Sequence, residues 1–516
     1  MGAARYICGM FIRKSKNRSG SVSVQVISKQ AGKSKVVKTI GSAADEQQIA
    51  ILVHRAKQEI ASLQKQETLF VFEKDALIES YLSSLENGQI RTVGPELIFG
   101  KIYDSIGFNA IEGGLFRHLV ISRLAFPLSK LKTVDYLYRY QGVSIGIDSV
   151  YRFLDKLNAT LKDQVEQITY KHTLKVLKNN ISIVFYDMTT IYFEASDEDD
   201  LRKPGFSKDG KHQNPQIFLG LLVGLGGYAI GYDIFDGGIY EGHTLIPVIE
   251  KLSAKFNLSK PIIVADAGLL SNDNIKSLEE NGYTYILGAR PKNETKEIKE
   301  KILETVLEDG QTMTIQKGAK KRLVIAYSNK RAAKDEHNRK RGLQRLEKKI
   351  KSGKLTKSNI NNKGYNKYLK MEGEINIKID YEKFDQDKSW DGLKGYITNT
   401  KLTPKRVIKN YKNLWHIEKA FRMSKTDLRI RPIYHHLQRR IEAHICISFT
   451  AYAIYKELER VLYKEKSPIS LVKAAELTHT MYQLNIMLPE SNHHKKILLK
   501  MDEDQSMLKN IIDKFF

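Results

Sequence analysis

The stretch ISIVFYD, residues 181–187, decides the fold class. It reads as a buried strand that ends in the carboxylate of Asp187, because short and nearly uninterrupted apolar runs are typical of strands covered on both faces. A second run of this kind, PIIVAD at residues 261–266, ends in Asp266. The two runs predict core strands, each with an acidic residue at its carboxyl end.

The segments around these two runs complete a mixed sheet. Residues 217–225 and 228–235 predict two strands joined by a pair of glycines, which is a strong hairpin signal. A helix is expected at residues 244–256, and a helix from Asn272 and a strand at 283–287 follow the second run. This order of elements describes an α/β fold in which helices flank a mixed sheet.

The charge of the chain favours a polyanionic partner. Of its 516 residues, 84 are Lys or Arg and 59 are Asp or Glu, which leaves a net charge of +25. Such an excess favours nucleic acid, because each neutralised phosphate releases condensed counterions; a soluble basic enzyme is the alternative. Two cysteines without a CxxC pair fit a reducing cytoplasm. No apolar run is long enough to span a membrane, so no membrane partner is expected.

Changes of pattern divide the chain into six regions. In the first region, strands at 22–28 and 34–40 precede a polar helix from Asp45 to Lys65. The last region is expected to be helical and peripheral. The regions are a small β/α region at 1–65, a mostly helical region at 66–175, the two parts of the core at 176–290 and 396–465, an insertion between them at 291–395, and a C-terminal region at 466–516.

Two short helices in the second region have the spacing of a DNA-binding motif. They are expected at 129–140 and 147–157, with Gly142 and Gly146 between them. A helix-turn-helix would place Arg152 of the second helix in a DNA groove. An ordinary helical hairpin is the alternative.

The insertion at 291–395 is rich in lysine. It contains a β-like segment at 322–328 and a strand expected at 375–384. Its charged helix at 330–351 is either a solvated face or a DNA contact, because runs of Lys and Arg serve both purposes. After it, residues 391–398 re-enter the core, and helices are expected at 405–440 and 441–462.

Asp187 and Asp266 are the first candidates for chemistry. The carboxyl ends of strands are where open α/β sheets place their sites. Two carboxylates side by side make an oxygen-only site that suits Mg²⁺ or Mn²⁺ rather than zinc. Each aspartate could instead cap the segment that follows it, as Asp often does. The pair, in this order of strands, favours the metal.

A third ligand is offered by the segment YKNLWHIEKAFRMSK at residues 411–425. Tyr411, Glu418 and Lys425 are seven residues apart, which is nearly two helical turns, so a single helix would align them on one stripe. Arg422 lies one turn beyond Glu418. Such a stripe could hold a metal and grip phosphates. A solvated helix with a Glu418–Arg422 ion pair is the alternative.

The sequence resembles the DDE transposases of bacterial insertion sequences, in the group with a β-rich insertion before the final glutamate. The resemblance covers residues 180–450 well and the N-terminal region more loosely. It implies a ribonuclease-H-like catalytic core with a β-containing insertion domain and N-terminal DNA-binding regions. Five blocks carry it in the family's order: FYDMTT at 185–190, GFSKDGK at 205–211, PQIFLGLL at 215–222, VADAGLL at 264–270, and residues 411–425.

The resemblance also implies a reaction. It makes Asp187, Asp266 and Glu418 the catalytic carboxylates and the ligands of two Mg²⁺ or Mn²⁺ ions, which would serve an in-line phosphoryl transfer. Water would cut the ends of the element, and the freed 3′-OH would attack target DNA. Double-stranded DNA with terminal inverted repeats is the implied substrate, and synapsis of two ends implies a homodimer. The implied location is the bacterial cytoplasm, at the nucleoid.

Tyr411 and Lys425 match the group's Tyr/Arg/Glu/Lys block, in which these side chains bind DNA phosphates near the cut. The chain departs from the block at Leu414, where an arginine is expected. Arg422 is the candidate substitute. Tyr411 is expected to bind rather than react, because no covalent protein–DNA bond is needed; a tyrosine-recombinase role is the rival.

Two further functions remain open from the sequence, a metal-dependent nuclease on the same core and a non-catalytic DNA-binding relic of a transposase. The glycine-rich segment at 224–231 lacks the Gly-Lys-Ser/Thr ending of a nucleotide loop and is read as a hairpin. His435, His436 and His444 lack the companion spacing of a zinc site and are read as surface or core residues.

Overall fold

The computed structural model describes residues 9–17, 19–30, 33–64, 73–83, 85–194, 197–205, 207, 210–353, 355–356, 359–361, 364–372, 376–488 and 491–516. Parts of the sequence expectations lie outside these residues: Cys8, the helix end at Lys65, the start of a strand at Ile375, and Phe206, Lys208 and Asp209 of the block at 205–211. The chain forms two compact units, Met1–Asn87 and Gly88–Phe516.

The first unit contains a three-stranded antiparallel sheet in the order β1-β2-β3. Helix α1 packs on it, and Val24, Val26 and Ala56 are fully buried between them. The two expected strands and the helix are confirmed, and strand β1 was missed because it is mostly polar. The elements are β1 (Gly9–Lys16), β2 (Val22–Gln30), β3 (Lys33–Ala43), α1 (Glu46–Gln64) and α2 (Glu73–Ser83).

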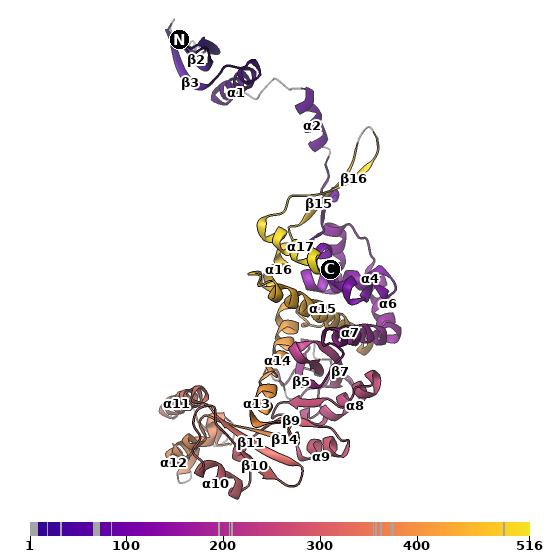
Figure 1. Cartoon of the computed structure of the whole chain (residues 1–516), viewed down its shortest axis with the longest axis vertical. Helices are drawn as coiled ribbons and strands as arrows, with labels where there is room; N and C mark the ends of the chain where they lie inside the picture. Colours follow the sequence, from indigo (N-terminus) through magenta and orange to yellow (C-terminus); the bar gives the residue numbers. More distant parts are fainter. Residues whose placement is uncertain are drawn as a thin grey trace. The chain divides into compact units, whose positions relative to one another are not determined.

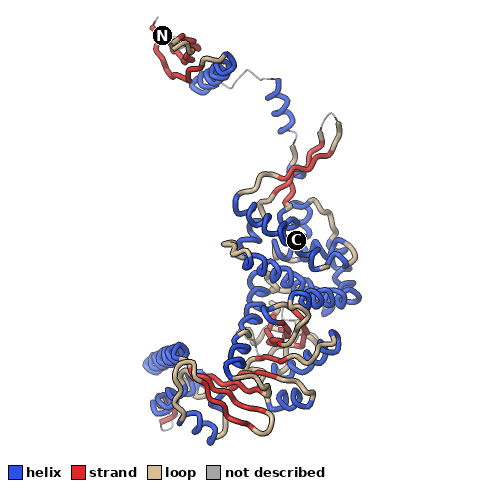
Figure 2. Tube along the Cα trace, viewed as in Figure 1, coloured by secondary structure: helices blue, strands red, loops and turns tan. Residues whose placement is uncertain are grey.

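The second unit is built on an eight-stranded sheet with the order β10-β11-β14-β9-β8-β5-β6-β7 (Figure 2). Strands β5, β6 and β7 are antiparallel neighbours, while β8 runs parallel to both β5 and β9. This sheet confirms the expected α/β fold class with a mixed sheet at its centre. The bounds are β5 (Ile183–Tyr192), β6 (Gln216–Gly224), β7 (Ala229–Asp236), β8 (Ile262–Ala265) and β9 (Tyr285–Ala289).

Helices cover both faces of this sheet (Figure 1). Side chains alternate along a strand, so Tyr186, Ile263 and Leu287 pack on one face against α8 (Leu245–Phe256) and α9 (Asn272–Glu280). The other face packs against α13 (Pro404–Lys412), α14 (Trp415–Arg422) and α15 (Gln438–Lys464). The sheet therefore lies in the middle of three layers.

The insertion begins by extending the core sheet. Its hairpin of β10 (Thr312–Lys317) and β11 (Lys321–Tyr327) pairs with β14 (Leu393–Thr398), which pairs with β9. The expected strand at 375–384 is wrong beyond Ile379, because Asp380 caps a short helix there by accepting a hydrogen bond from the Lys383 amide. The remaining elements are α10 (Lys296–Glu304), α11 (Asn329–Lys351), β12 (Leu369–Glu372), β13 (Asn376–Ile379) and α12 (Tyr381–Gln386).

A second helical layer surrounds α15, which is buried on all sides along most of its length, as is typical of a central core helix. The expected helix over 405–440 is wrong in its last part, because residues 428–437 form a non-helical loop that contains Pro432. The mostly helical character of 66–175 is confirmed. Its helices are α3 (Lys101–Ile106), α4 (Gly114–Ala125), α5 (Lys130–Tyr136), α6 (Ile147–Lys156) and α7 (Lys162–Val176).

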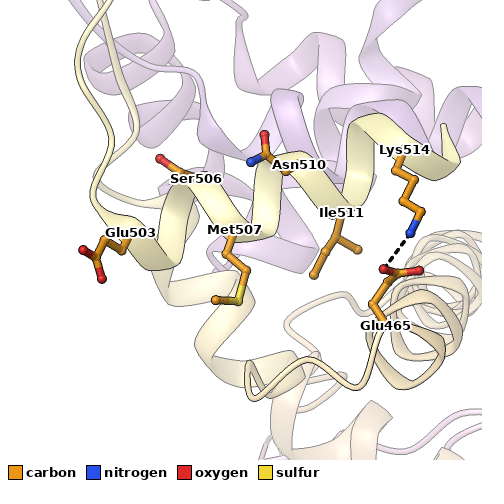
Figure 3. Close-up of a pocket in the computed structure, with 7 residues that line it drawn as sticks. All are labelled: Glu465, Glu503, Ser506, Met507, Asn510, Ile511 and Lys514. Atoms are coloured by element: carbon orange, nitrogen blue, oxygen red, sulfur yellow. Dashed lines mark hydrogen bonds and ion pairs between the residues drawn. The ribbon is translucent and has the colours of Figure 1, made fainter.

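The C-terminal region is neither wholly helical nor peripheral. A hairpin of β15 (Tyr482–Met487) and β16 (His494–Leu498) pairs with β4 (Ile90–Thr92), and it follows α16 (Leu471–Thr478). Helix α17 (Glu503–Phe515) then buries Leu508 and Ile512 in the main core. Lys514 of α17 pairs with Glu465 at the end of α15 at 2.8 Å (Figure 3). Within the described residues, no helix has the length and apolar character to cross a membrane.

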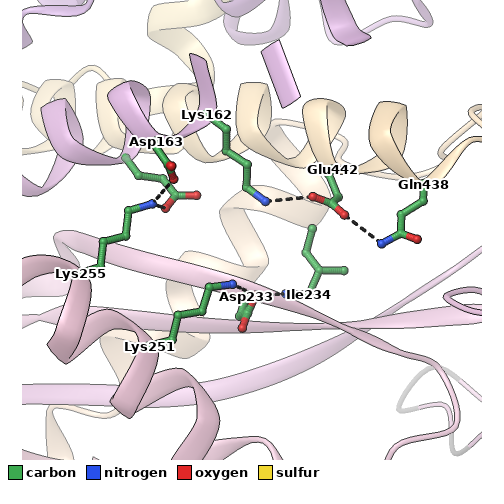
Figure 4. Close-up of polar contacts among 9 residues, drawn as sticks. Lys162, Asp163, Asp233, Ile234, Lys251, Lys255, Gln438 and Glu442 are labelled. Carbon is green, nitrogen blue, oxygen red and sulfur yellow. Dashed lines mark hydrogen bonds and ion pairs between the residues drawn. The ribbon is translucent and has the colours of Figure 1, made fainter. Parts of the chain in front are cut away.

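Ion pairs join the helical layer to the sheet layer (Figure 4). Lys255 of α8 contacts Glu166 of α7 at 2.5 Å, and the side chain of Glu166 is only 5% exposed. Lys251, one turn earlier on α8, contacts Asp233 at 2.7 Å; the lysine side chain is 54% exposed, against 19% for Lys255, and the Asp233 side chain is 18% exposed. The two pairs share a helix and differ in burial, which makes them a matched comparison.

Replacing Lys255 by Met is expected to lower the free energy of unfolding by about 3 to 5 kcal/mol, because the buried Glu166 carboxylate loses its cation. Urea unfolding followed by circular dichroism measures the change. Adding Glu166→Gln should restore much of the loss, since no buried charge is then left unpaired.

The control is Lys251→Met on the same helix, which should change the free energy of unfolding by no more than about 1 kcal/mol, as is usual for an exposed pair. Equal losses in the two single variants would show that burial of Glu166 is not the cause.

Candidate active site

Asp187 and Asp266 lie abreast on neighbouring strands. The parallel pairing of β5 with β8 ends at Tyr186 and Ala265, so the two aspartates occupy the next position on each strand. Neighbouring strands are about 4.8 Å apart. The expectation that the first strand ends at Asp187 is wrong, because pairing with β6 continues β5 to Tyr192. Asp187 therefore lies at the carboxyl end of the parallel pairing of β5 with β8, and not at the end of its own strand.

The same row continues across the sheet. Ala265 pairs with Leu287 on β9, so Gly288 lies beside Asp266. Gly288 pairs in turn with Tyr396 on β14. Phe185 and Val264, two positions before the aspartates, belong to the core under α13 and α14. Because side chains alternate, both carboxylates leave the sheet on the face that these helices cover.

Hydrogen bonds fix one oxygen of each aspartate. Asp266 Oδ1 accepts from the amides of Gly268 at 2.8 Å and Leu269 at 3.3 Å. Asp187 Oδ1 accepts from the amide of Met188 at 2.7 Å. Asp266 therefore does cap the turn that follows it, as the alternative interpretation proposed. Capping uses only Oδ1 of Asp266, so Oδ2 is available to a ligand.

Tyr411 of α13 lies over this row of residues. Its ring is 4.9 Å from that of Tyr396, and its hydroxyl occupies the space over Gly288, where a Cβ would come within 2.5 Å of the hydroxyl oxygen. A side chain at 288 would also approach the amide nitrogen of Ala267 to 2.9 Å. Glycine is needed at this position because helix and sheet approach so closely.

All three carboxylates act electrostatically on the Tyr411 hydroxyl. Burial raises the pKa of Tyr411 above its ordinary value, and Asp266, Glu418 and Asp187 raise this pKa further. The side chain is 7% exposed, and no hydrogen-bond partner of its hydroxyl occurs in the described part of the chain. The structure therefore brings the residues 187, 266, 411 and 418 into one neighbourhood.

The expected single helix over 411–425 is wrong. Helix α13 ends at Lys412, α14 begins at Trp415, and a π-helix, Met423–Asp427, follows. The amides of Leu414 and Ile417 bond three residues back, to Tyr411 and Leu414, so the turn is tighter than an α-helix. Tyr411 is therefore buried, whereas Glu418 and Arg422 are exposed and Lys425 is half-buried.

Glu418 does not form a three-ligand cluster with the two aspartates. The residues that the structure describes contain no group of three or more Asp, Glu, His or Cys side chains arranged to hold a metal ion. Glu418 also forms no ion pair with Arg422, both of which are described, so the surface-pair interpretation is wrong. Leu414, where an arginine was expected, is 5% exposed and packs in the core.

Lys394 is a residue of this neighbourhood that sequence reasoning missed. It lies on β14 two positions before Tyr396, and its Nζ is 4.4 Å from the centre of the Tyr411 ring. Burial lowers the pKa of Lys394, Arg331 and Lys412 lower it further, and Glu418 and Asp266 raise it. No carboxylate of the described residues pairs with it. The sequence did offer a signal for Lys394: it lies two residues before Tyr396, and side chains two residues apart in a strand share a face.

Arg152 lies elsewhere, on α6. Its guanidinium donates a hydrogen bond to Ser149 at 3.1 Å, and the side chain is exposed. Asp155 on the same helix pairs with Arg439 and Arg440 of α15, both at 2.9 Å. Two short helices therefore exist where the helix-turn-helix was expected, and α6 is attached to the central helix.

Comparison with known proteins identifies the class. The family model described as a transposase DDE domain matches residues 178–454, which is more than half of the chain. No curated protein matches. A solved structure, described as the cryo-EM structure of a piggyBac transposase synaptic complex with hairpin DNA, has a TM-score of 0.37 and 12% identity over 75% of this chain and 76% of that chain. The chain belongs to the family of DDE-domain transposases, and it is a DNA transposase.

Proposed function

We propose that Asp187, Asp266 and Glu418 are the catalytic carboxylates with which this transposase cuts the ends of its element and joins the freed 3′-OH to target DNA. The observation that supports this most is the register of β5 and β8, which sets the two aspartates abreast on the face beneath α13 and α14. Glu418 completes the set from α14.

The donor set fits the divalent metal ions on which DDE transposases depend. The three side chains supply only carboxylate oxygens, the ligands that Mg²⁺ and Mn²⁺ prefer. We propose two such ions, which when bound polarise the scissile phosphodiester and activate the attacking oxygen. The Gly268 and Leu269 amides hold Oδ1 of Asp266, which leaves its Oδ2 available as a metal ligand.

The proposed chemistry has two balanced steps. In the first, water breaks the phosphodiester at the end of the element, which leaves a 3′-OH on one side and a 5′-phosphate on the other. In the second, that 3′-OH attacks a target phosphodiester, so that one P–O bond forms and one breaks, and the target's own 3′-OH leaves. Neither step needs a covalent bond to the protein, and Tyr411 binds rather than reacts.

Four side chains are proposed to hold DNA phosphates at the cut: Tyr411, Lys425, Arg422 and Lys394. The hydroxyl of Tyr411 has no partner in the described part of the chain, and it fills the space that the missing side chain of Gly288 leaves. The Lys394 ammonium supplies a half-buried charge beside it. Leu414 offers no such contact because it packs in the core.

The finer identity of the protein is also a proposal. We place it with the transposases of bacterial insertion sequences that carry a β-rich insertion, acting at the nucleoid in the cytoplasm. Its duplex substrates would be terminal inverted repeats and target DNA, joined by a homodimer because two ends must be synapsed. The helical region at 66–175, with Arg152, would bind the DNA ends.

Asp187→Asn, Asp266→Asn and Glu418→Gln are each expected to slow cutting and joining at least about a thousandfold, because several kcal/mol of transition-state stabilisation are lost with the metal. The assay supplies a duplex with the element's ends, Mg²⁺ and a target plasmid. Retention of DNA in a gel shift should persist.

Asp273→Asn, an exposed residue in the first turn of α9, is the matched control and should cut at the wild-type rate. Cutting by Asp266→Asn at that same rate would refute the assignment. Nicks without joined products in the wild type would point to the nuclease instead.

Gly288→Ala is expected to slow cutting about a hundredfold, because the new methyl group displaces the Tyr411 hydroxyl and a displacement near 1 Å has such effects. The same clash should lower the unfolding midpoint. Adding Tyr411→Phe should recover part of that loss, since it removes the atom closest to the new methyl group. Gly114→Ala, whose methyl group has ordinary contacts, is the control. Wild-type cutting by Gly288→Ala would show that the position of Tyr411 does not matter.

Lys394→Met keeps the aliphatic stem against Tyr411 and removes the charge. Its affinity for DNA should fall about tenfold, and the slope of log Kd against log salt should fall by about one, as for one lost phosphate contact. Lys401→Met, an exposed lysine after the same strand, is the control. An unchanged slope with an altered unfolding midpoint would make Lys394 purely structural.

A further inference from the structure

A basic cavity lies away from the carboxylates, where the helical layer meets the loop that follows α14. Its volume is about 520 Å³. The α4–α5 connection forms one wall, loop 428–437 another, and Tyr151 of α6 and His444 of α15 close it. Five of its residues are cationic, namely Arg123, Lys130, Lys132, Arg429 and Arg431. None of its lining residues is a carboxylate.

Two of these cations are almost completely buried. Arg123 is 5% exposed, and its guanidinium donates to the carbonyls of Arg429 at 3.2 Å and Leu428 at 3.5 Å. Lys130 is 6% exposed, and within the described residues its ammonium has no hydrogen-bond or ion-pair partner. Burial of an unpaired charge costs free energy, so this lysine is suited to meet an anion.

No carboxylate of the described residues lines the cavity, and burial together with the nearby Arg123 lowers the pKa of Lys130 well below its ordinary value. Of the acidic residues beside its walls, Asp155 of α6 is paired with Arg439 and Arg440, and Asp197 lies 3.6 Å from His436 of loop 428–437. Burial, with Lys130, Arg440, Arg123 and His436, lowers the pKa of His435 to about 3. Burial, Arg123 and Lys130 also lower the pKa of His444. Both rings are therefore neutral at neutral pH, and the field that acts on them is positive.

We propose that this cavity binds a phosphate group of a DNA strand, with Lys130 and Arg429 as its principal contacts and Arg123 holding the loop that carries Arg429. A phosphate stabilises the protonated form of Lys130 and accepts a charge-assisted hydrogen bond from it, which no group among the described residues does. A cation-only cavity in a protein that acts on DNA selects a phosphodiester over neutral ligands. The site rests on the activity toward DNA and is independent of the assignment of Asp187, Asp266 and Glu418.

Lys130→Met and Arg429→Gln test the site in the full-length protein. The first keeps the volume and removes a charge without a partner, so the fold should be retained; the second changes an exposed side chain whose backbone strain at φ 44° is the same for Gln. Binding to a random-sequence DNA duplex is measured in EDTA, where no cutting occurs. Each variant should bind about tenfold more weakly, with a slope against salt smaller by about one.

Lys296→Met, an exposed lysine on α10, is the control and should bind as the wild type does. In a second arm, inorganic phosphate at matched ionic strength should raise the unfolding midpoint of the wild type and not that of Lys130→Met. Protection by phosphate together with unchanged DNA binding in both variants would assign the cavity to a free phosphorylated molecule and overturn the DNA site. No difference in either arm would overturn the proposal entirely.

Discussion

The rest of the site depends on where the parallel pairing of β5 and β8 stops. At Tyr186 and Ala265 the backbone hydrogen bonds between these strands end, and the next residue of each strand is an aspartate. The pleat then sends both carboxylates to the face beneath α13 and α14, because Phe185 and Val264 already occupy that face. A shift of one residue in this register would send one carboxylate to the opposite face, under α8 and α9. The hydrophobic cores on both sides of the sheet hold the register against that shift.

A second constraint is the close approach of α13 to β9. Gly288 leaves the space that the Tyr411 hydroxyl fills, and Tyr396 on the next strand supports the ring. The buried phenol has a raised pKa and remains protonated, so it adds no further negative charge beside the carboxylates and keeps its hydroxyl proton for a ligand. Lys394 brings a positive charge to the same place. In the proposed site, a DNA phosphate would meet this hydroxyl and this ammonium beside the carboxylates.

Local patterns in the sequence predicted the core well because its strands are continuous apolar runs and its hairpin has paired glycines. As candidates, Asp187 and Asp266 followed from those strands, and Glu418 from the helical spacing of residues 411, 418 and 425 together with the family resemblance. Lys394 could not be found in the same way, because β14 joins β9 only after the long insertion has folded back. The C-terminal hairpin was missed for a similar reason, since β15 pairs with β4 near the other end of this unit. The break between α13 and α14 depends on the burial of Leu414, which no local residue preference reveals.

The proposed catalytic and phosphate sites share one stretch of chain. From Glu418 the backbone runs through the π-helix Met423–Asp427 directly into loop 428–437, which forms a wall of the basic cavity. The Arg123 guanidinium holds that loop by its carbonyls, and the imidazole of His444 on α15 contacts the Ile430 carbonyl at 2.8 Å. A phosphate bound by Lys130 and Arg429 would thus act on the segment that also carries Glu418.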